Sequence, residues 1–321
     1  MSASSIHDHR LADAEAGPLA PDALPDGLAA QPAAGRRRGG RSARTGSALL
    51  KVGSYIALTI GAVAILAPFL WMLRTVLTPN DVLYSPDGGG IIPRRLSLDN
   101  IRAALTDGIQ PFQVYFVNSL IVTSIVVISN VIFCGMAGYA LARKQFFGRK
   151  AIMVLIVLML AVPIESRIIP LYILTSKAGL SDTFLGLALP LLVTSFGIFL
   201  MRQYVMTISR EIDEAAVMDG CSEWSLYWRI IFPICRPVLA AIAVFTFITA
   251  WNDYLWPLVI TSSQEMQTLP VAVANMAVVK DQLRWGSLLA FSLLSVLPVL
   301  IFYLCMQRQF IAGITGGAVK E

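Results

Sequence analysis

Charged residues are scarce in this chain of 321 residues, and histidine is almost missing. Asp, Glu, Lys and Arg make up only 14% of the residues, whereas 56% are hydrophobic. A soluble fold of this size could not hide so much apolar surface, so the composition favours a lipid bilayer as the solvent. The two histidines, His7 and His9, lie in the polar N-terminal segment. The apolar part therefore has no imidazole for catalysis or for a metal ion.

Cysteine is also sparse, and its spacing excludes further classes. The four cysteines are Cys134, Cys221, Cys235 and Cys305, and no two of them have the spacing of metal ligands or of a disulfide framework. The net charge of +5 comes from short basic clusters beside apolar runs, where such clusters signal membrane topology rather than nucleic-acid binding. We expect no catalytic site, no metal site and no nucleic-acid partner.

Long apolar runs dominate the rest of the chain. They cover residues 52–73, 114–141, 151–174, 184–201, 238–260 and 287–307. A helix rises about 1.5 Å per residue and the hydrocarbon core is about 30 Å thick, so each run is near or above spanning length. The sequence therefore predicts an all-α integral membrane protein with six transmembrane helices. Pro163, with Glu165 and Arg167 after it, predicts a bend in the third span.

The segments outside these runs suggest domains and an orientation. Residues 1–47 are rich in Ala, Pro, Gly, Asp and Arg without periodicity, which predicts a disordered tail. Residues 48–315 form the predicted transmembrane domain, and 316–321 a short C-terminal tail. Of the 25 Lys and Arg residues, 17 fall on the side of the membrane that holds both tails. Because basic residues next to spans stay in the cytoplasm, we expect both termini there.

The segment 206–236, between the fourth and fifth predicted spans, has the pattern of two helices and a break. Ser209 is a suitable N-cap for the first helix, and Gly220 supplies a left-handed stop. Ser222 can cap the second helix, which should end before Pro233. Large side chains at three- and four-residue steps form one stripe on that helix: Trp224, Tyr227, Trp228 and Ile231. Taken alone, this pattern also fits a hairpin that merely packs under the bundle.

The residue spacing in this segment resembles the EAA loop of binding-protein-dependent ABC importers. The positions that carry the resemblance are Glu214, Ala215, Ala216, Gly220, Ile230 and Pro233. Phe232 stands where family members mostly have Leu. Three further stretches, 97–101, 118–119 and 251–257, look like the carbohydrate branch of the family, the MalG-like permeases.

This resemblance implies a MetI-like permease architecture in the bacterial cytoplasmic (inner) membrane, crossing the lipid several times. It implies three kinds of partner: a second permease subunit in a heterodimer, two ATP-binding subunits and an external solute-binding protein. The loop, including Asp219, would transmit closure of the ATPase to the spans. This chain lacks the Gly-x-x-x-x-Gly-Lys-Ser/Thr loop that cradles nucleotide phosphates, so ATP and Mg are expected on the partner. The chain itself is expected to bind no cofactor and to be a transport subunit, not an enzyme.

The fifth predicted span contains a mixture of rings and polar groups suited to a sugar. The residues are Trp251, Asn252, Asp253, Tyr254 and Trp256. Sugars are bound by aromatic faces and directional hydrogen bonds, so these residues are candidates for the transport pathway. Trp and Tyr also form belts at membrane interfaces without any transport role.

Several functions stay open at this point. The predicted solute is a mono- or oligosaccharide, with glycerol phosphate, a polyol or another solute as the alternative. A polytopic membrane enzyme and a passive channel are more distant alternatives. ATP-dependent uptake in the presence of the partners would separate these classes.

Overall fold

The computed structural model describes residues 40–85, 90, 92–93, 95–106, 110–278 and 285–315, with the backbone alone for 40–50 and 309–315. The chain divides into two compact units, Met1–Gly61 and Ala62–Glu321. Every regular element in the described part of the chain is a helix. Residues 1–39 of the predicted N-terminal tail, and the predicted C-terminal tail 316–321, lie outside the described residues.

Helix α1, Gly40–Val76, contains the first predicted span. It begins earlier than the predicted domain boundary at residue 48, so residues 40–47, which the sequence assigns to the tail, are helical. The reason is local: no proline occurs between Pro32 and Pro68, and the intervening Arg and Ala residues favour a helix. The first described residues of the chain are thus already helical.

The second predicted span is one continuous helical rod. It consists of α4, Phe112–Ser129, a π-helical turn η1, Asn130–Cys134, and α5, Gly135–Arg143. These elements together form a span of 32 residues. The rod is central to the larger unit because α4 packs against α13 (Arg236–Trp251) and α8 (Phe184–Ala188), and α5 packs against α9 (Ser195–Thr207).

The third and fourth predicted spans are bent. The third consists of α6, Arg149–Leu160, η2, Ile164–Arg167, and α7, Ile168–Lys177, with a bend of 106°. The break includes Pro163, which confirms the predicted bend. The fourth consists of α8, Phe184–Ala188, η3, Leu189–Leu191, and α9, Ser195–Thr207, with a bend of 49°. The sequence pattern had not indicated this second bend.

The fifth predicted span, 238–260, is broken as well, which corrects the expectation of one helix. Helix α13 covers Arg236–Trp251 and α14 covers Leu255–Ile260. A proline removes the hydrogen bond to the carbonyl four residues earlier and its ring clashes with that carbonyl. Pro257 therefore prevents a helix from continuing through Asp253, and the chain restarts a helix with the proline in its first turn.

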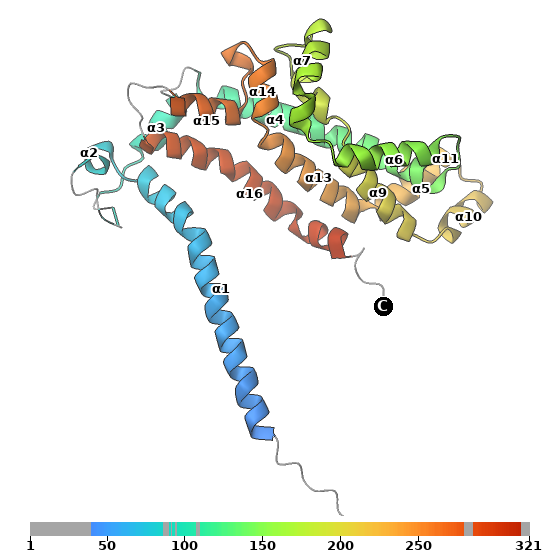
Figure 1. Ribbon diagram of the computed structural model, residues 1–321, viewed down its shortest axis with the longest axis horizontal. Helices are drawn as coiled ribbons and strands as arrows, with labels where there is room; N and C mark the ends of the chain where they lie inside the picture. The colour runs from blue at the N-terminus through green and yellow to red at the C-terminus, as the bar shows by residue number, and fades with distance from the viewer. Residues whose placement is uncertain are drawn as a thin grey trace, which may run out of the picture. The chain divides into compact units, whose positions relative to one another are not determined.

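The remaining helices complete the larger unit. Helix α1 is followed by two short helices, α2, Asn80–Leu83, and α3, Asp99–Thr106. Between α9 and α13 lie four short elements: α10, Glu211–Met218, α11, Glu223–Ser225, η4, Leu226–Ile231, and α12, Phe232–Ile234. The last described elements are η5, Gln264–Met266, α15, Leu269–Val278, and α16, Trp285–Thr315. Helices α13 and α16 lie side by side, while α10 and α11 are found where α5 and α9 end (Figure 1).

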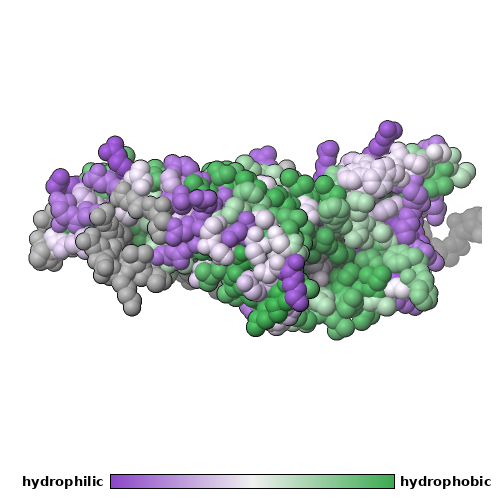
Figure 2. Space-filling model, turned by 90° about the horizontal axis from the view of Figure 1, so that it is seen from above, coloured by the Kyte–Doolittle hydropathy of each residue, from purple (hydrophilic) through white to green (hydrophobic). Residues whose placement is uncertain are grey.

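Three of the described helices are long and apolar enough to cross a membrane. Up to six spans result if each bent pair counts as one, and the third such pair is Glu223–Ile234 with Arg236–Trp251, bent by 75°. Many of their large apolar side chains are exposed, as Leu58, Val154 and Ile301 illustrate. Figure 2 shows hydrophobic residues across the middle of one face, with more hydrophilic residues toward both ends of the view. An apolar belt of this kind is what a bilayer requires, so the chain is an all-α, multi-pass membrane protein.

Buried amide side chains join the helices of the larger unit. The Asn100 amide, at the start of α3, donates to the carbonyls of Val76 and Thr78 at the end of α1 (3.1 and 2.7 Å). The Asn130 amide donates to the carbonyl of Leu191 (2.6 Å), and its oxygen accepts from the hydroxyl of Thr194 (2.7 Å). Asn130 thereby satisfies the backbone at the break between η3 and α9, since a broken helix leaves polar groups that need partners.

Candidate functional site

The first helix of the predicted hairpin forms, but its N-cap position is Arg210, whose side chain makes no capping hydrogen bond, and not the predicted Ser209. Ser209 accepts a hydrogen bond from the backbone N–H of Glu211 (3.3 Å), where α10 begins. Glu211, Asp213 and Glu214 lie in the first turn, where negative charge is favoured by the helix dipole. The helix is short and carries three acidic residues, and Ala216 is its one buried residue.

The turn between the two hairpin helices depends on glycine. Gly220 has φ +77°, and the N–H of Cys221 donates to the carbonyl of Ala216 (2.9 Å) while that of Gly220 donates to Val217 (3.0 Å). This pair of bonds is the Schellman motif that ends many helices. A Cβ on Gly220 would meet nothing within 4 Å, so the backbone conformation alone requires glycine there.

The second hairpin helix is longer than expected. Ser222 caps it by accepting from the N–H of Ser225 (3.3 Å), as predicted. The helical turns of α11, η4 and α12 then follow without a gap to Ile234, whereas the sequence predicted an end before Pro233. The wider π-helical turn of η4 changes the spacing of the carbonyls, and Pro233 falls in the first turn of α12, where its missing N–H is tolerated.

The predicted aromatic stripe is divided by the fold. Tyr227 and Ile231 are buried, at 3% and 0% exposure, whereas Trp224 is 62% exposed. Trp228 lies between them: its ring centroid is 5.0 Å from that of Tyr227 and 5.8 Å from that of Trp224, both in edge-on contact. The stripe therefore runs from the protein core to the surface, and only its inner half anchors the hairpin.

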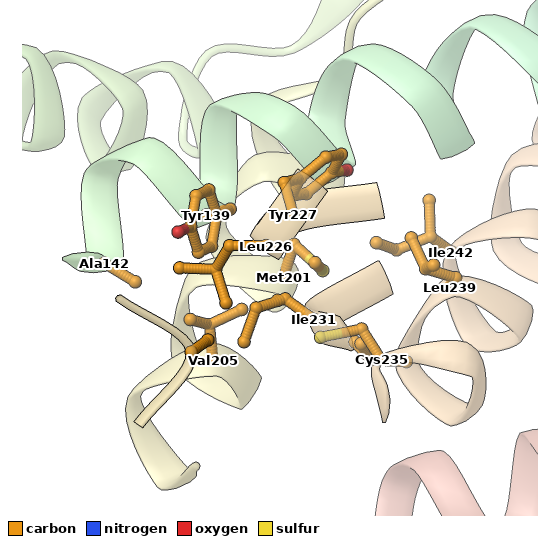
Figure 3. Close-up of a cluster of buried hydrophobic side chains, with 12 residues drawn as sticks. Tyr139, Ala142, Met201, Val205, Leu226, Tyr227, Ile231, Cys235, Leu239 and Ile242 are labelled. Atoms are coloured by element: carbon orange, nitrogen blue, oxygen red, sulfur yellow. The ribbon is translucent and has the colours of Figure 1, made fainter. Parts of the chain in front are cut away.

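The inner half of the stripe belongs to a buried cluster. Figure 3 shows Tyr139 of α5, Met201 and Val205 of α9, and Leu226 and Ile231 of the hairpin gathered together. Helices α5 and α9 approach closely here because of Gly138, where a Cβ would lie 2.6 Å from the Cβ of Met201. Small residues allow such close approach of membrane helices.

The residues of the EAA pattern separate into an accessible group and a packed group. Glu214, Ala215, Asp219 and Gly220 are exposed; Ala216 is buried; Ile230 and Pro233 are intermediate. Beside the accessible group lie Val217 and Met218, with 57% and 87% of their surfaces exposed. The end of α10 thus presents a mixed polar and apolar surface that the described residues leave uncovered.

Two ion pairs join the hairpin to α5, and sequence reasoning missed both. Arg143 Nε lies 2.9 Å from Asp213 Oδ2, and Lys144 pairs with Glu223. Arg143 and Lys144 are recognisable in the sequence as basic residues after the second predicted span, but there they indicated only the orientation of the chain in the membrane. A cavity of about 560 Å³ lies beside these pairs, between α5 and the hairpin.

The predicted pathway residues have different surroundings. Trp251 and Trp256 are both 2% exposed, and their indole N–H groups donate to the carbonyls of Ser295 (3.0 Å) and Gly186 (3.1 Å). Asn252 and Tyr254 are exposed, and Asp253 is intermediate. The two indoles therefore link helices, while Asn252 and Tyr254, between α13 and α14, are exposed.

Sequence reasoning also missed a second, uncharged cavity. Its volume is about 360 Å³, and it lies where the broken fourth span meets α4 and α13. Its lining includes Thr194, Phe196, Phe245 and Thr249, and the rings of Phe196 and Phe245 meet edge-on at 5.2 Å. The break beside Thr194 was not predicted, so nothing in the sequence pattern brought these residues together.

Comparison with known proteins places these features in a family. Residues 135–315 match the family described as "Binding-protein-dependent transport system inner membrane component". That match covers more than half of the chain, so the chain belongs to this family and is a membrane permease.

Individual proteins similar to this chain are also permeases. The chain is 35% identical over 228 residues to the arabinooligosaccharides transport system permease protein AraQ of Halalkalibacterium halodurans, covering 71% of this chain and 81% of AraQ. It is 31% identical over 271 residues to the sn-glycerol-3-phosphate transport system permease protein UgpE of Pectobacterium atrosepticum, covering 83% and 96%.

The fold is likewise shared with a solved structure. One chain in the crystal structure of a bacterial ABC transporter involved in the import of the acidic polysaccharide alginate superposes with a TM-score of 0.75. The match covers 84% of this chain and 98% of that one, at 24% sequence identity. The predicted permease architecture is therefore confirmed at the level of the fold.

Proposed function

We propose that this chain is one permease subunit of an ATP-driven importer for a sugar or oligosaccharide. ATP would be bound with Mg and hydrolysed on partner subunits, and the hairpin would carry their movement to the spans. The observation that best supports this is the accessible end of α10, where Glu214, Ala215 and Asp219 stand beside exposed Met218. An uncovered apolar patch with polar neighbours is typical of a protein interface.

The partners follow from the same proposal. Two ATP-binding subunits would each receive one coupling hairpin, one of them from this chain and the other from a second permease subunit. An external solute-binding protein would deliver the solute. The chain would lie in the bacterial cytoplasmic membrane with both termini and the hairpin in the cytoplasm, as the distribution of Lys and Arg indicates.

The solute is proposed to be uncharged. The cavity beside Thr194 has hydroxyl groups and aromatic rings, and none of the described residues that line it is charged. Such a lining suits a sugar, whereas a phosphate group would call for the positive charge of Arg or Lys. Of the predicted pathway residues, Asn252 and Tyr254 have the exposure needed to touch a solute, and Trp251, Asp253 and Trp256 would support them.

Two hairpin variants test coupling. Gly220→Val forces a β-branched residue to a positive φ and should misdirect the second hairpin helix. Glu214→Lys places a positive charge in the first turn of α10, against the helix dipole, on the exposed surface. We expect normal abundance in the membrane, weaker co-purification of the ATPase and loss of uptake in both variants.

Gly179→Val is the matched control. Gly179 also has a positive φ, +70°, and a Cβ there would also meet nothing within 4 Å, but it lies between α7 and α8 rather than in the hairpin. The same backbone strain should therefore leave ATPase co-purification intact. Undiminished uptake in both hairpin variants would contradict coupling through this hairpin.

The orientation has its own test. In a variant without native cysteines, a cysteine at Glu265 should react with an impermeant reagent added outside intact cells, while one at Arg149 should not. Reversed labelling would place the hairpin outside the cell and exclude contact with an ATPase.

A further inference from the structure

The last residue of α5 contacts two separate parts of the chain. The Arg143 side chain is only 6% exposed, and its Nε lies 2.9 Å from the Oδ2 of Asp213, which is 18% exposed. Its Nη2 donates to the carbonyl of Ile208 (2.8 Å) and approaches that of Ser209 (3.3 Å). One guanidinium at the end of the second span thus holds both the link after α9 and the first turn of α10.

This contact is important because α10 has little else to hold it. Ala216 is the one buried residue of the helix, and the cavity of about 560 Å³ separates much of α10 from α5. Side chains therefore do not pack these two elements together at this point. A buried pair between opposite charges adds little net stability, but it fixes where its two partners lie.

The neighbouring residue makes a parallel contact with the other hairpin helix. Lys144 pairs with Glu223 at the start of α11, and its ammonium lies 5.8 Å from the centre of the Tyr139 ring. The side chains of this pair are 40% and 66% exposed, so water and salt screen it and it is the weaker link. Together the two pairs connect the end of α5 to both sides of the turn at Gly220.

We infer that Arg143 is a positioning residue for coupling: through Asp213 and the carbonyls that follow α9, it makes the first hairpin helix move together with the second span. This inference rests on the proposed function, because it assumes that the hairpin is moved by an ATPase. It assigns the route by which that movement reaches α5. Lys144 and Glu223 add a weaker, solvent-exposed connection beside it.

The test uses the whole transporter with its ATPase and binding protein, reconstituted in vesicles. The quantity measured is solute taken up per ATP hydrolysed, normalised to the intact complex that survives purification. Arg143→Gln and Asp213→Asn should each lower this ratio at least about fivefold, the low end of coupling between distant sites. The double variant should lose no more than the stronger single variant, because both remove the same contact.

Two further variants separate positioning from simple loss of structure. Arg143→Lys keeps the charge but not the planar fork that reaches the carboxylate and the carbonyls together, so it should recover part of the ratio. Lys144→Gln removes the exposed pair and should change the ratio less than Arg143→Gln does. These outcomes would support the inference.

Other outcomes would overturn it. An unchanged ratio in Arg143→Gln, whether abundance is normal or reduced, would leave Arg143 with a structural role alone. If Gly220→Val and Glu214→Lys abolish uptake while Arg143→Gln keeps the full ratio, the coupling hairpin stands and the route through Arg143 fails. If none of these three variants changes uptake, the proposed coupling function itself fails.

Discussion

The two helices of the hairpin are held to the same bundle by different forces. The second helix, 223–234, buries Leu226, Tyr227 and Ile231 in the cluster shared with α5, α9 and α13. The first helix, α10, buries Ala216 alone and is tied by the Arg143–Asp213 pair. Burial of apolar surface is lost only when a helix leaves the core, whereas an ion pair can hold a helix without packing it.

This difference indicates how a coupling element can be both anchored and movable. The second helix is part of the protein core and should follow α9 and α13 closely. The first helix can shift while exposing little buried surface, but a shift would displace the Arg143 guanidinium at the end of α5, because Asp213 is paired with it. Each half of this comparison can be tested with one buried and one exposed residue of the same type.

The largest effect is expected from truncating the anchor of the second helix. Ile231 has 0% exposure, so Ile231→Ala should lower the free energy of unfolding by about 2–5 kcal/mol, the usual cost of a large cavity. Ile212, on α10, is 36% exposed, and Ile212→Ala should change stability by less than about 0.5 kcal/mol. Thermal unfolding of the purified complex measures both, and equal losses would contradict the division between the helices.

A smaller effect is expected from enlarging the one packed residue of α10. Ala216 is 5% exposed, so Ala216→Leu overpacks the site and should destabilise by about 1–3 kcal/mol. Ala215→Leu is the control because Ala215 is exposed. Its effect should appear in ATPase co-purification instead of in thermal unfolding. If Ala216→Leu is tolerated in both measurements, α10 is packed even less than the structure shows.

The outer end of the aromatic stripe should affect binding and not folding. Trp224 is 62% exposed, so Trp224→Ala should leave the unfolding temperature of the isolated chain nearly unchanged. We expect weaker retention of the ATPase on an affinity column, because exposed tryptophans often contribute much of the binding energy at interfaces. A drop in unfolding temperature as large as that of Ile231→Ala would show that the whole stripe is structural.

The smallest effect concerns a link made by hydrogen bonds outside the hairpin. Asp182 Oδ1 accepts from the N–H groups of Ser262 (2.8 Å) and Ser263 (3.1 Å). Burial raises the pKa of this carboxyl, but those hydrogen bonds outweigh burial and hold the pKa below its ordinary value. Asp182 therefore contributes stability above the pKa of the unfolded chain, near 3.9, and loses it as pH falls through the lower folded pKa.

Asp182→Asn isolates that charge, because asparagine also tolerates the positive φ of 53°. The unfolding temperature of the wild type should exceed that of the variant at neutral pH, and the difference should shrink in acid. A difference that is constant with pH would show that the carboxylate charge plays no part in the link.

Much of this architecture could be predicted from sequence because its causes are local. The length of an apolar run indicates a span whatever its neighbours are, and Pro163 bends the third span by removing a hydrogen bond within that span. Gly220 and Ser222 shape the hairpin for the same reason: a cap or a left-handed turn involves only a few adjacent residues.

Tertiary structure decided the features that depend on residues far apart in the chain. The pattern of α13 could not show that Trp251 donates to Ser295, and the basic end of α5 could not show that Arg143 meets Asp213. The stripe from Trp224 to Ile231 was readable as one face, but which half is buried depends on where α5 and α9 lie. Periodicity describes one helix at a time, whereas burial and ion pairing arise only where separate helices meet.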